Sequence, residues 1–68
     1  MKYYIKKINK QTGRVEYKQY KCIEGFNPNK SLCWKFSQQG AEKIIERLKI
    51  EYRMNINNLT FELEEAAD

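Results

Sequence analysis

A single amphipathic segment in the middle of the chain constrains the fold most. Its apolar residues recur at helical spacing: Ala41, Ile44, Ile45, Leu48 and Tyr52. That spacing places them on one face of a helix, and Ser37 precedes the segment where an N-cap belongs. We therefore predict a helix from about Gln38 to about Met54. Because the chain has only 68 residues, the remaining segments must build the one surface that covers this stripe.

Three strand-like segments precede the predicted helix. Residues 2–8 and 15–23 are rich in aromatic and β-branched residues, and they are separated by residues 9–13, where Gly13 suits a positive φ. A second turn over residues 25–30 leads to a third predicted strand, residues 32–36. Short turns between successive strands favour an antiparallel three-stranded meander.

The last segment, residues 59–64, alternates strictly between apolar and polar side chains. Leu59, Phe61 and Leu63 are expected to point inward. The predicted order is therefore β-β-β-α-β, an α+β fold in which one helix packs on the meander and a C-terminal strand joins the sheet. We expect a single domain over residues 1–64 and a short acidic tail over residues 65–68. The right-handed crossover rule leaves open whether the last strand runs parallel to the first or to the third.

The positions of the turns predict which side chains share a face. A first hairpin turning at Gln11 and Thr12 pairs residues whose numbers add up to 23, and a second turning at Asn27 and Pro28 pairs those that add up to 55. The face covered by the helix would then hold Tyr4, Ile8, Val15, Tyr17, Ile23, Leu32, Trp34 and Phe36. The uncovered face would hold Tyr3, Ile5, Lys7, Lys18, Tyr20, Cys22, Cys33 and Lys35. A slip of one residue would exchange the two sets.

Charge is distributed unevenly along the chain, whose formal net charge is +4. Through Phe36 there are nine basic and two acidic residues, a net +7, and the remainder has four basic and seven acidic residues, a net −3. The basic part coincides with the predicted meander. A basic, tyrosine-bearing sheet face suits nucleic acid and equally an acidic protein surface. The alternative is that these side chains only solvate an exposed face and protect its edges from aggregation.

The residue types argue against catalysis. Histidine is absent, the three glycines are isolated, and the carboxylate pairs lie on predicted solvent-facing sides. We therefore expect a non-enzymatic protein with no cofactor and no metal. Apolar runs are far shorter than the roughly 20 residues of a membrane span or the 7 to 15 of a signal-peptide core, so we expect a cytoplasmic protein with no membrane partner.

The two cysteines, Cys22 and Cys33, lack the CxxC spacing of zinc and redox motifs. In the second-hairpin register given above they face each other across two strands. We therefore treat them as a hypothetical redox pair whose disulfide would be strained and easily reduced. The alternative is two reduced, half-buried thiols.

Several short segments carry a family likeness: Lys2-Tyr3-Tyr4-Ile5, Thr12-Gly13-Arg14, Trp34-Lys35-Phe36-Ser37, Gly40-Ala41-Glu42-Lys43-Ile44-Ile45 and Phe61-Glu62-Leu63-Glu64. In these and in its layout the chain resembles short proteins encoded by bacteriophages and mobile elements of Gram-positive bacteria. It is also loosely similar to the arm-binding domain of tyrosine recombinases, in which a sheet reads DNA, but it adds an acidic strand that would repel phosphates.

The resemblance implies a binding protein that engages a host or defence protein, an inhibitor such as an anti-CRISPR being one form. The contact residues that we predict on the uncovered face are Tyr3, Lys7, Lys18, Tyr20 and Lys35. One alternative is a small nucleic-acid-binding regulator or recombination accessory factor that uses the same face. Another is a structural protein that self-associates through a strand edge or through Ile50 and Met54.

Overall fold

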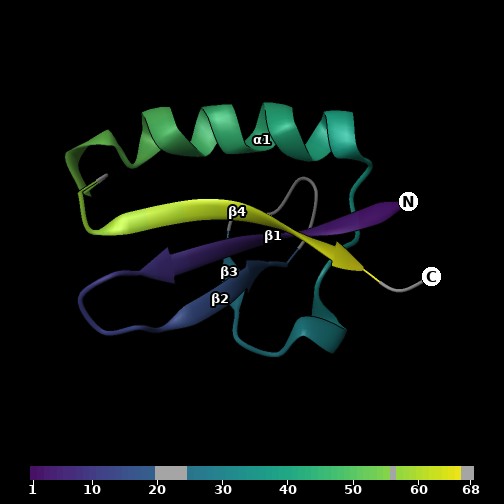
Figure 1. Ribbon diagram of the computed structural model, residues 1–68, viewed down its shortest axis with the longest axis horizontal. Coiled ribbons are helices and arrows are strands. Elements are labelled where there is room, and N and C mark those ends of the chain that lie inside the picture. The colour runs from purple at the N-terminus through teal and green to yellow at the C-terminus, as the bar shows by residue number, and fades with distance from the viewer. Residues whose placement is uncertain (20–24, 56, 67–68) are drawn as a thin grey trace.

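The computed structural model describes residues 1–19, 25–55 and 57–66. Within them, helix α1 (Gln38–Glu51) packs on a four-stranded antiparallel sheet in the order β3-β2-β1-β4, and its axis runs along the direction of β1 and β4 (Figure 1). The strands are β1 (Lys2–Asn9), β2 (Val15–Lys18), β3 (Phe26–Asn27) and β4 (Leu59–Ala66). Two short 3-10 helices are η1 (Lys30–Leu32) and η2 (Arg53–Asn55). The predicted α+β fold, with its meander, single helix and C-terminal strand, is confirmed.

The first hairpin follows local sequence signals. The Asn9 side-chain oxygen accepts hydrogen bonds from the backbone N–H groups of Gln11 (2.9 Å) and Thr12 (3.2 Å). Gly13 takes a φ of 75° and donates its N–H to the Asn9 carbonyl at 2.7 Å, so a residue without a Cβ closes the turn. The predicted register is confirmed by the pairs Lys6 with Tyr17, Lys7 with Glu16 and Ile8 with Val15.

The second hairpin differs from the prediction. β2 pairs with β3 through Tyr17 with Asn27 and Lys18 with Phe26, so the register that adds up to 55 is wrong. The predicted strand over residues 32–36 is also wrong in its first part, because Leu32 ends η1. The physical reason is local hydrogen bonding, since asparagine side chains offer the backbone an alternative to strand pairing.

The asparagines on either side of Pro28 supply those bonds. The Asn27 side-chain oxygen accepts the N–H of Asn29 (2.8 Å), and the Asn29 oxygen accepts the N–H of Ser31 (3.1 Å) as the N-cap of η1. After η1 the chain returns to β1, where Phe36 forms an isolated antiparallel bridge.

Helix α1 begins where the sequence predicts and ends earlier. The Ser37 hydroxyl accepts the N–H of Gly40 at 3.2 Å, so the predicted N-cap is confirmed. The helix ends at Glu51 rather than near Met54, and the following residues tighten into η2. The apolar stripe is confirmed: Ala41 and Leu48 are buried, and Ile44, Ile45 and Tyr52 pack partly buried against the core. Ile50 and Met54 are exposed.

Strand β4 occupies the edge of the sheet beside β1. It runs antiparallel to β1. Phe36, at the end of the predicted third strand, also pairs antiparallel with β1, on the opposite edge of β1. β4 therefore runs parallel to that segment and not to the first strand. β4 also continues to Ala66, because Lys2 and Tyr3 pair with Ala66 and Glu65. Residues 65 and 66, predicted to lie in the acidic tail, therefore belong to the sheet.

The pairing of β4 decides which face of the sheet is covered. Ile5 lies opposite Leu63 and Lys7 opposite Phe61, so the odd-numbered residues of β1 share a face with the apolar side of β4. Ile5 is fully buried and belongs to the same core cluster as Leu48 of α1.

The predicted faces of β1 and β2 are therefore exchanged. The expectation that the helix covers Tyr4, Ile8, Val15 and Tyr17 is wrong, because these residues alternate with the buried ones. Phe36 is buried as expected, whereas Leu32 and Trp34 are about half exposed. Ile23 lies outside the described residues.

Candidate binding site

The basic face predicted for binding is not one uncovered surface. Lys18 is only 7 % exposed, and its ammonium lies 5.6 Å from the centre of the Phe26 ring on the helix side of the sheet. The Lys7 ammonium lies 4.4 Å from the same ring and 3.6 Å from the Glu16 carboxylate. Both lysines thus bring their charges to the Phe26 ring, and Lys7 also brings its charge to the Glu16 carboxylate.

The other predicted contact residues are dispersed. Tyr3 is half-buried on the helix side, where its backbone pairs with Phe36. Lys35 is exposed one residue before Phe36. Tyr20 lies outside the described residues, so its placement stays a prediction.

The open face of the sheet is balanced in charge. Glu64 of β4 accepts a hydrogen bond from the Lys30 ammonium (2.6 Å) and another from the Tyr17 hydroxyl (3.3 Å), and it lies 3.6 Å from the Lys6 ammonium. Lys6 also lies 3.9 Å from Glu62. The carboxylates of β4 thus neutralise the lysines of this face.

This cluster affects the titration of its members. The hydrogen bond from Lys30 holds the pKa of the Glu64 carboxyl below its usual value, with smaller contributions from the charges of Lys30 and Lys6. The same hydrogen bond raises the pKa of Lys30. The Lys30 ammonium also lies 5.7 Å and 5.6 Å from the ring centres of Tyr4 and Tyr17. The bond between Lys30 and Glu64 thus holds the loop that carries η1 against the open face of the sheet.

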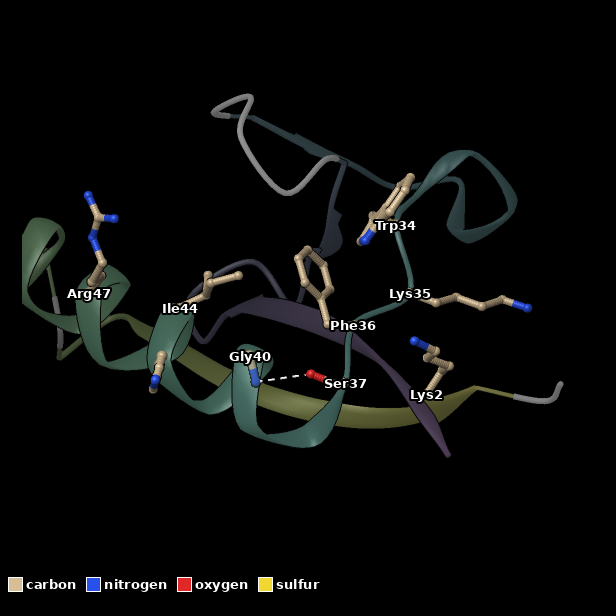
Figure 2. Close-up of a pocket in the computed structure, with 9 residues that line it drawn as sticks. Lys2, Trp34, Lys35, Phe36, Ser37, Gly40, Ile44 and Arg47 are labelled. Atoms are coloured by element: carbon tan, nitrogen blue, oxygen red, sulfur yellow. Dashed lines mark hydrogen bonds between the residues drawn. The ribbon is translucent and has the colours of Figure 1, made fainter.

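A groove of about 540 Å³ lies between α1 and the segment that leads into it, and we call it the basic groove (Figure 2). Its walls carry the cationic side chains Lys2, Lys35, Lys43 and Arg47, and its apolar surface comes from Trp34, Phe36 and Ile44; Ser37 and Gly40 complete it. None of these nine lining residues is acidic. All four cationic residues are exposed, so the groove presents positive charge to solvent beside apolar surface.

The two walls of the basic groove have different local origins. On α1, positions 40, 43, 44 and 47 follow helical spacing and form a stripe beside the one that enters the core. On the other wall, Phe36 exchanges two backbone hydrogen bonds with Tyr3 (2.8 and 2.7 Å), and the backbone N–H of Trp34 donates to the Gln19 carbonyl (2.9 Å). This segment is thereby held to the sheet on both sides of Lys35.

Trp34 is the residue of this wall that differs most from expectation. Phe36 points between the two walls in Figure 2 and is 4 % exposed, whereas Trp34 is 48 % exposed. Trp34 is the only tryptophan of the chain.

Of the predicted contact residues that the structure describes, only Lys35 lines the basic groove. The sequence did not predict Lys43 and Arg47 as contact residues, because charged helix residues at this spacing usually form a solvated face. The available signal was that they are four residues apart, next to the apolar stripe. Among the residues that the structure describes, Lys2, Lys43 and Arg47 form no ion pair.

Only Cys33 of the predicted redox pair lies within the described residues. Cys33 is half-buried, and its Sγ lies 3.4 to 3.7 Å from the carbonyl oxygens of Tyr17, Asn27 and Asn29. Burial raises the pKa of the Cys33 thiol. Cys22 lies outside the described residues. The register that placed the two opposite each other is wrong, so a redox pair stays a prediction without that support.

The same described residues offer no metal site and no membrane-spanning helix. No group of three or more acidic or cysteine side chains is placed to hold a metal ion, and no helix is long and apolar enough to cross a membrane. No protein-family model, curated protein or solved structure matches the chain. The basic groove is the candidate site that we consider further.

Proposed function

We propose that this chain is a non-enzymatic binding protein of a bacteriophage or mobile element, and that it engages a host or defence protein through the basic groove. The observation that carries the proposal is the composition of the groove, four exposed cations around apolar surface with no carboxylate among the lining residues. An inhibitor that covers a functional surface of its target is the form of action that best fits a small module of this kind.

The charges of the groove define the partner's chemistry. Lys35 and Lys2 lie toward the Ser37 end, and Arg47 projects from α1 beyond Ile44 (Figure 2). A ligand lying along the groove meets positive charge from both walls. A segment with several carboxylates complements this arrangement and is steered toward it at low salt.

The apolar surface between the charges adds a second requirement. Trp34 and Arg47 are residue types that often dominate binding energy at protein interfaces. The half-exposed Trp34 ring gains further burial when an apolar side chain packs on it. We therefore expect an acidic segment of a folded partner with at least one apolar anchor residue.

The test reverses two charges of the groove while keeping the fold. The double variant Lys43→Glu with Arg47→Glu changes exposed residues that form no ion pair with described residues, so its stability should change by less than about 1 kcal/mol. The matched control is Lys10→Glu with Lys49→Glu, which makes the same change of charge at exposed positions outside the groove. Both variants are immobilised beside the wild-type chain and exposed to lysate of a Gram-positive bacterium.

We expect the wild-type chain and the control variant to capture the same protein. The affinity of the groove variant for that protein should be lower by about tenfold or more, which is a loss of at least about 1.4 kcal/mol of binding free energy. Equal capture by all three chains would exclude the groove as the contact surface. Gel shifts with single-stranded and duplex DNA at two salt concentrations form the second arm. DNA binding that depends on the groove and weakens steeply with salt would identify nucleic acid, rather than a protein, as the partner.

A further inference from the structure

The free edge of β4 is a second feature of the molecule with binding chemistry. β4 is eight residues long and lies at one end of the strand order, so only one of its edges is paired within the described sheet. Its register with β1 is continuous from Leu59 to Ala66 without a bulge. Edge strands of this length are usually protected by charged side chains, above all lysine, by proline or by a bulge; β4 has no proline and no bulge, and its charged residues, Glu62, Glu64 and Glu65, are all acidic.

The direction of each backbone group along β4 follows from the register. Tyr3 exchanges hydrogen bonds with Phe36, and Asn9 donates its N–H to Arg14, so the odd residues of β1 direct their backbone groups away from β4. The even residues of β1 therefore bond to Thr60, Glu62, Glu64 and Ala66. The bond from the Lys10 N–H to the Asn58 carbonyl (2.7 Å) continues the same alternation.

The remaining residues of β4 direct their N–H and C=O groups outward from the sheet: Leu59, Phe61, Leu63 and Glu65. No backbone group of the described residues outside the strands bonds to them. Each offers one donor and one acceptor, which is the pattern that an added strand satisfies.

Side chains on the two faces of β4 define which strand fits. On the open face, Glu62 keeps about half of its side chain exposed, and Glu64 lies two residues further along. On the helix face, Leu59 and Leu63 are half-buried, so apolar surface reaches this part of the sheet, and the exposed Glu65 follows them near the end of the strand. A strand with basic residues on one face and apolar residues on the other complements both.

We propose that β4 accepts an extended segment of a partner protein by strand addition, and that this segment alternates basic and apolar residues. Its backbone bonds to the outward groups of β4, its basic side chains lie beside Glu62, whose side chain is about half exposed, and its apolar side chains extend the layer beneath α1. A second copy of β4 does not fit, because it would bring its own carboxylates beside those of this edge, and like charges on facing strands repel.

The test uses the full chain labelled with ¹⁵N and three synthetic peptides. The first is capped (Lys-Val)₄, which has the proposed alternation. The second, capped (Lys-Pro)₄, keeps the charges but lacks the donors and extended pairing of a strand. The third, capped (Glu-Val)₄, keeps the strand character and reverses the charges. The readout is amide hydrogen exchange along β4.

With (Lys-Val)₄ we expect exchange at the outward amides of Phe61, Leu63 and Glu65 to slow by about tenfold or more, while the amides of Glu62 and Glu64, already bonded to β1, change little. (Lys-Pro)₄ and (Glu-Val)₄ should produce no such alternation. Equal slowing along β4, no slowing, or the same slowing with (Lys-Pro)₄ would overturn strand addition. Slowing by (Glu-Val)₄ would overturn the charge assignment, and concentration-dependent slowing without peptide would make a second copy the occupant.

Discussion

Replacing Ile5 by valine tests which face of β1 enters the core. Ile5 is fully buried beneath α1, whereas Ile8 lies half-buried on the open face of the same strand. Valine and isoleucine have similar strand propensity. The two substitutions therefore differ mainly in how closely the removed methylene group was packed in the wild-type chain. A buried Ile→Val change usually costs 0.5–1.5 kcal/mol.

The size of the effect is measurable in a chain of 68 residues. Its total stability should be about 3–10 kcal/mol from the usual value per residue. With a urea dependence of about 1 kcal/mol per molar, Ile5→Val lowers the unfolding midpoint by about 0.5–1.5 M. Ile8→Val should lower it by less than about 0.5 M.

Urea unfolding followed by circular dichroism at 222 nm compares Ile5→Val and Ile8→Val with the wild-type chain. The slope of the transition should be the same in all three, since neither substitution alters the exposed surface of the unfolded chain appreciably. A larger loss for Ile8→Val than for Ile5→Val would refute the assignment of the covered face and, with it, the pairing of β1 with β4.

Two further predictions concern local interactions. Ser37→Ala removes the N-cap of α1 and should lower the free energy of unfolding by about 1 kcal/mol, or the Tm by about 4–8 °C. Ser37→Asp should retain most of the wild-type stability. Equal Tm values for the wild-type and alanine chains would contradict the role of this cap. Glu64→Gln tests the open-face cluster: because the pKa of Glu64 is lowered in the fold, its stabilising effect is present above its unfolded pKa and is lost as pH falls through the folded value. Between about pH 5 and pH 3 the Tm of the wild-type chain should therefore fall more steeply than that of Glu64→Gln, and parallel curves would exclude this contribution.

The sequence predicted those parts of the fold that depend on neighbouring residues. Ser37 caps α1, Gly13 closes the first hairpin, and the helical stripe from Ala41 to Tyr52 packs against the core. Each rests on a few adjacent residues whose chemistry has one dominant outcome.

The parts that could not be predicted depend on distant pairing. β1 carries aromatic residues and lysines on both faces, so its alternation alone does not select the side that contains Ile5. Its pairing with β4, more than fifty residues away, selects it. The lysine ammonium of Lys7 is then accommodated beside Phe26 and Glu16, an arrangement that no single segment reveals.

The candidate site follows the same rule. The cationic residues Lys43 and Arg47 are visible in the sequence as a pair on one helix. Their neighbours Trp34 and Lys35 join them only because the segment before α1 is held against β1 by the bridge between Phe36 and Tyr3.

The most direct test of the proposed binding site uses Trp34, the only tryptophan of the chain and a lining residue of the basic groove. The chain is labelled with 5-fluorotryptophan, and its single ¹⁹F resonance is recorded during titration with the protein that the wild-type chain captures. If the groove is the contact surface, the resonance shifts and broadens until the partner is equimolar, and the variant Lys43→Glu with Arg47→Glu shows no change at the same concentrations. Saturated binding that leaves the Trp34 resonance at its free position would contradict the proposal.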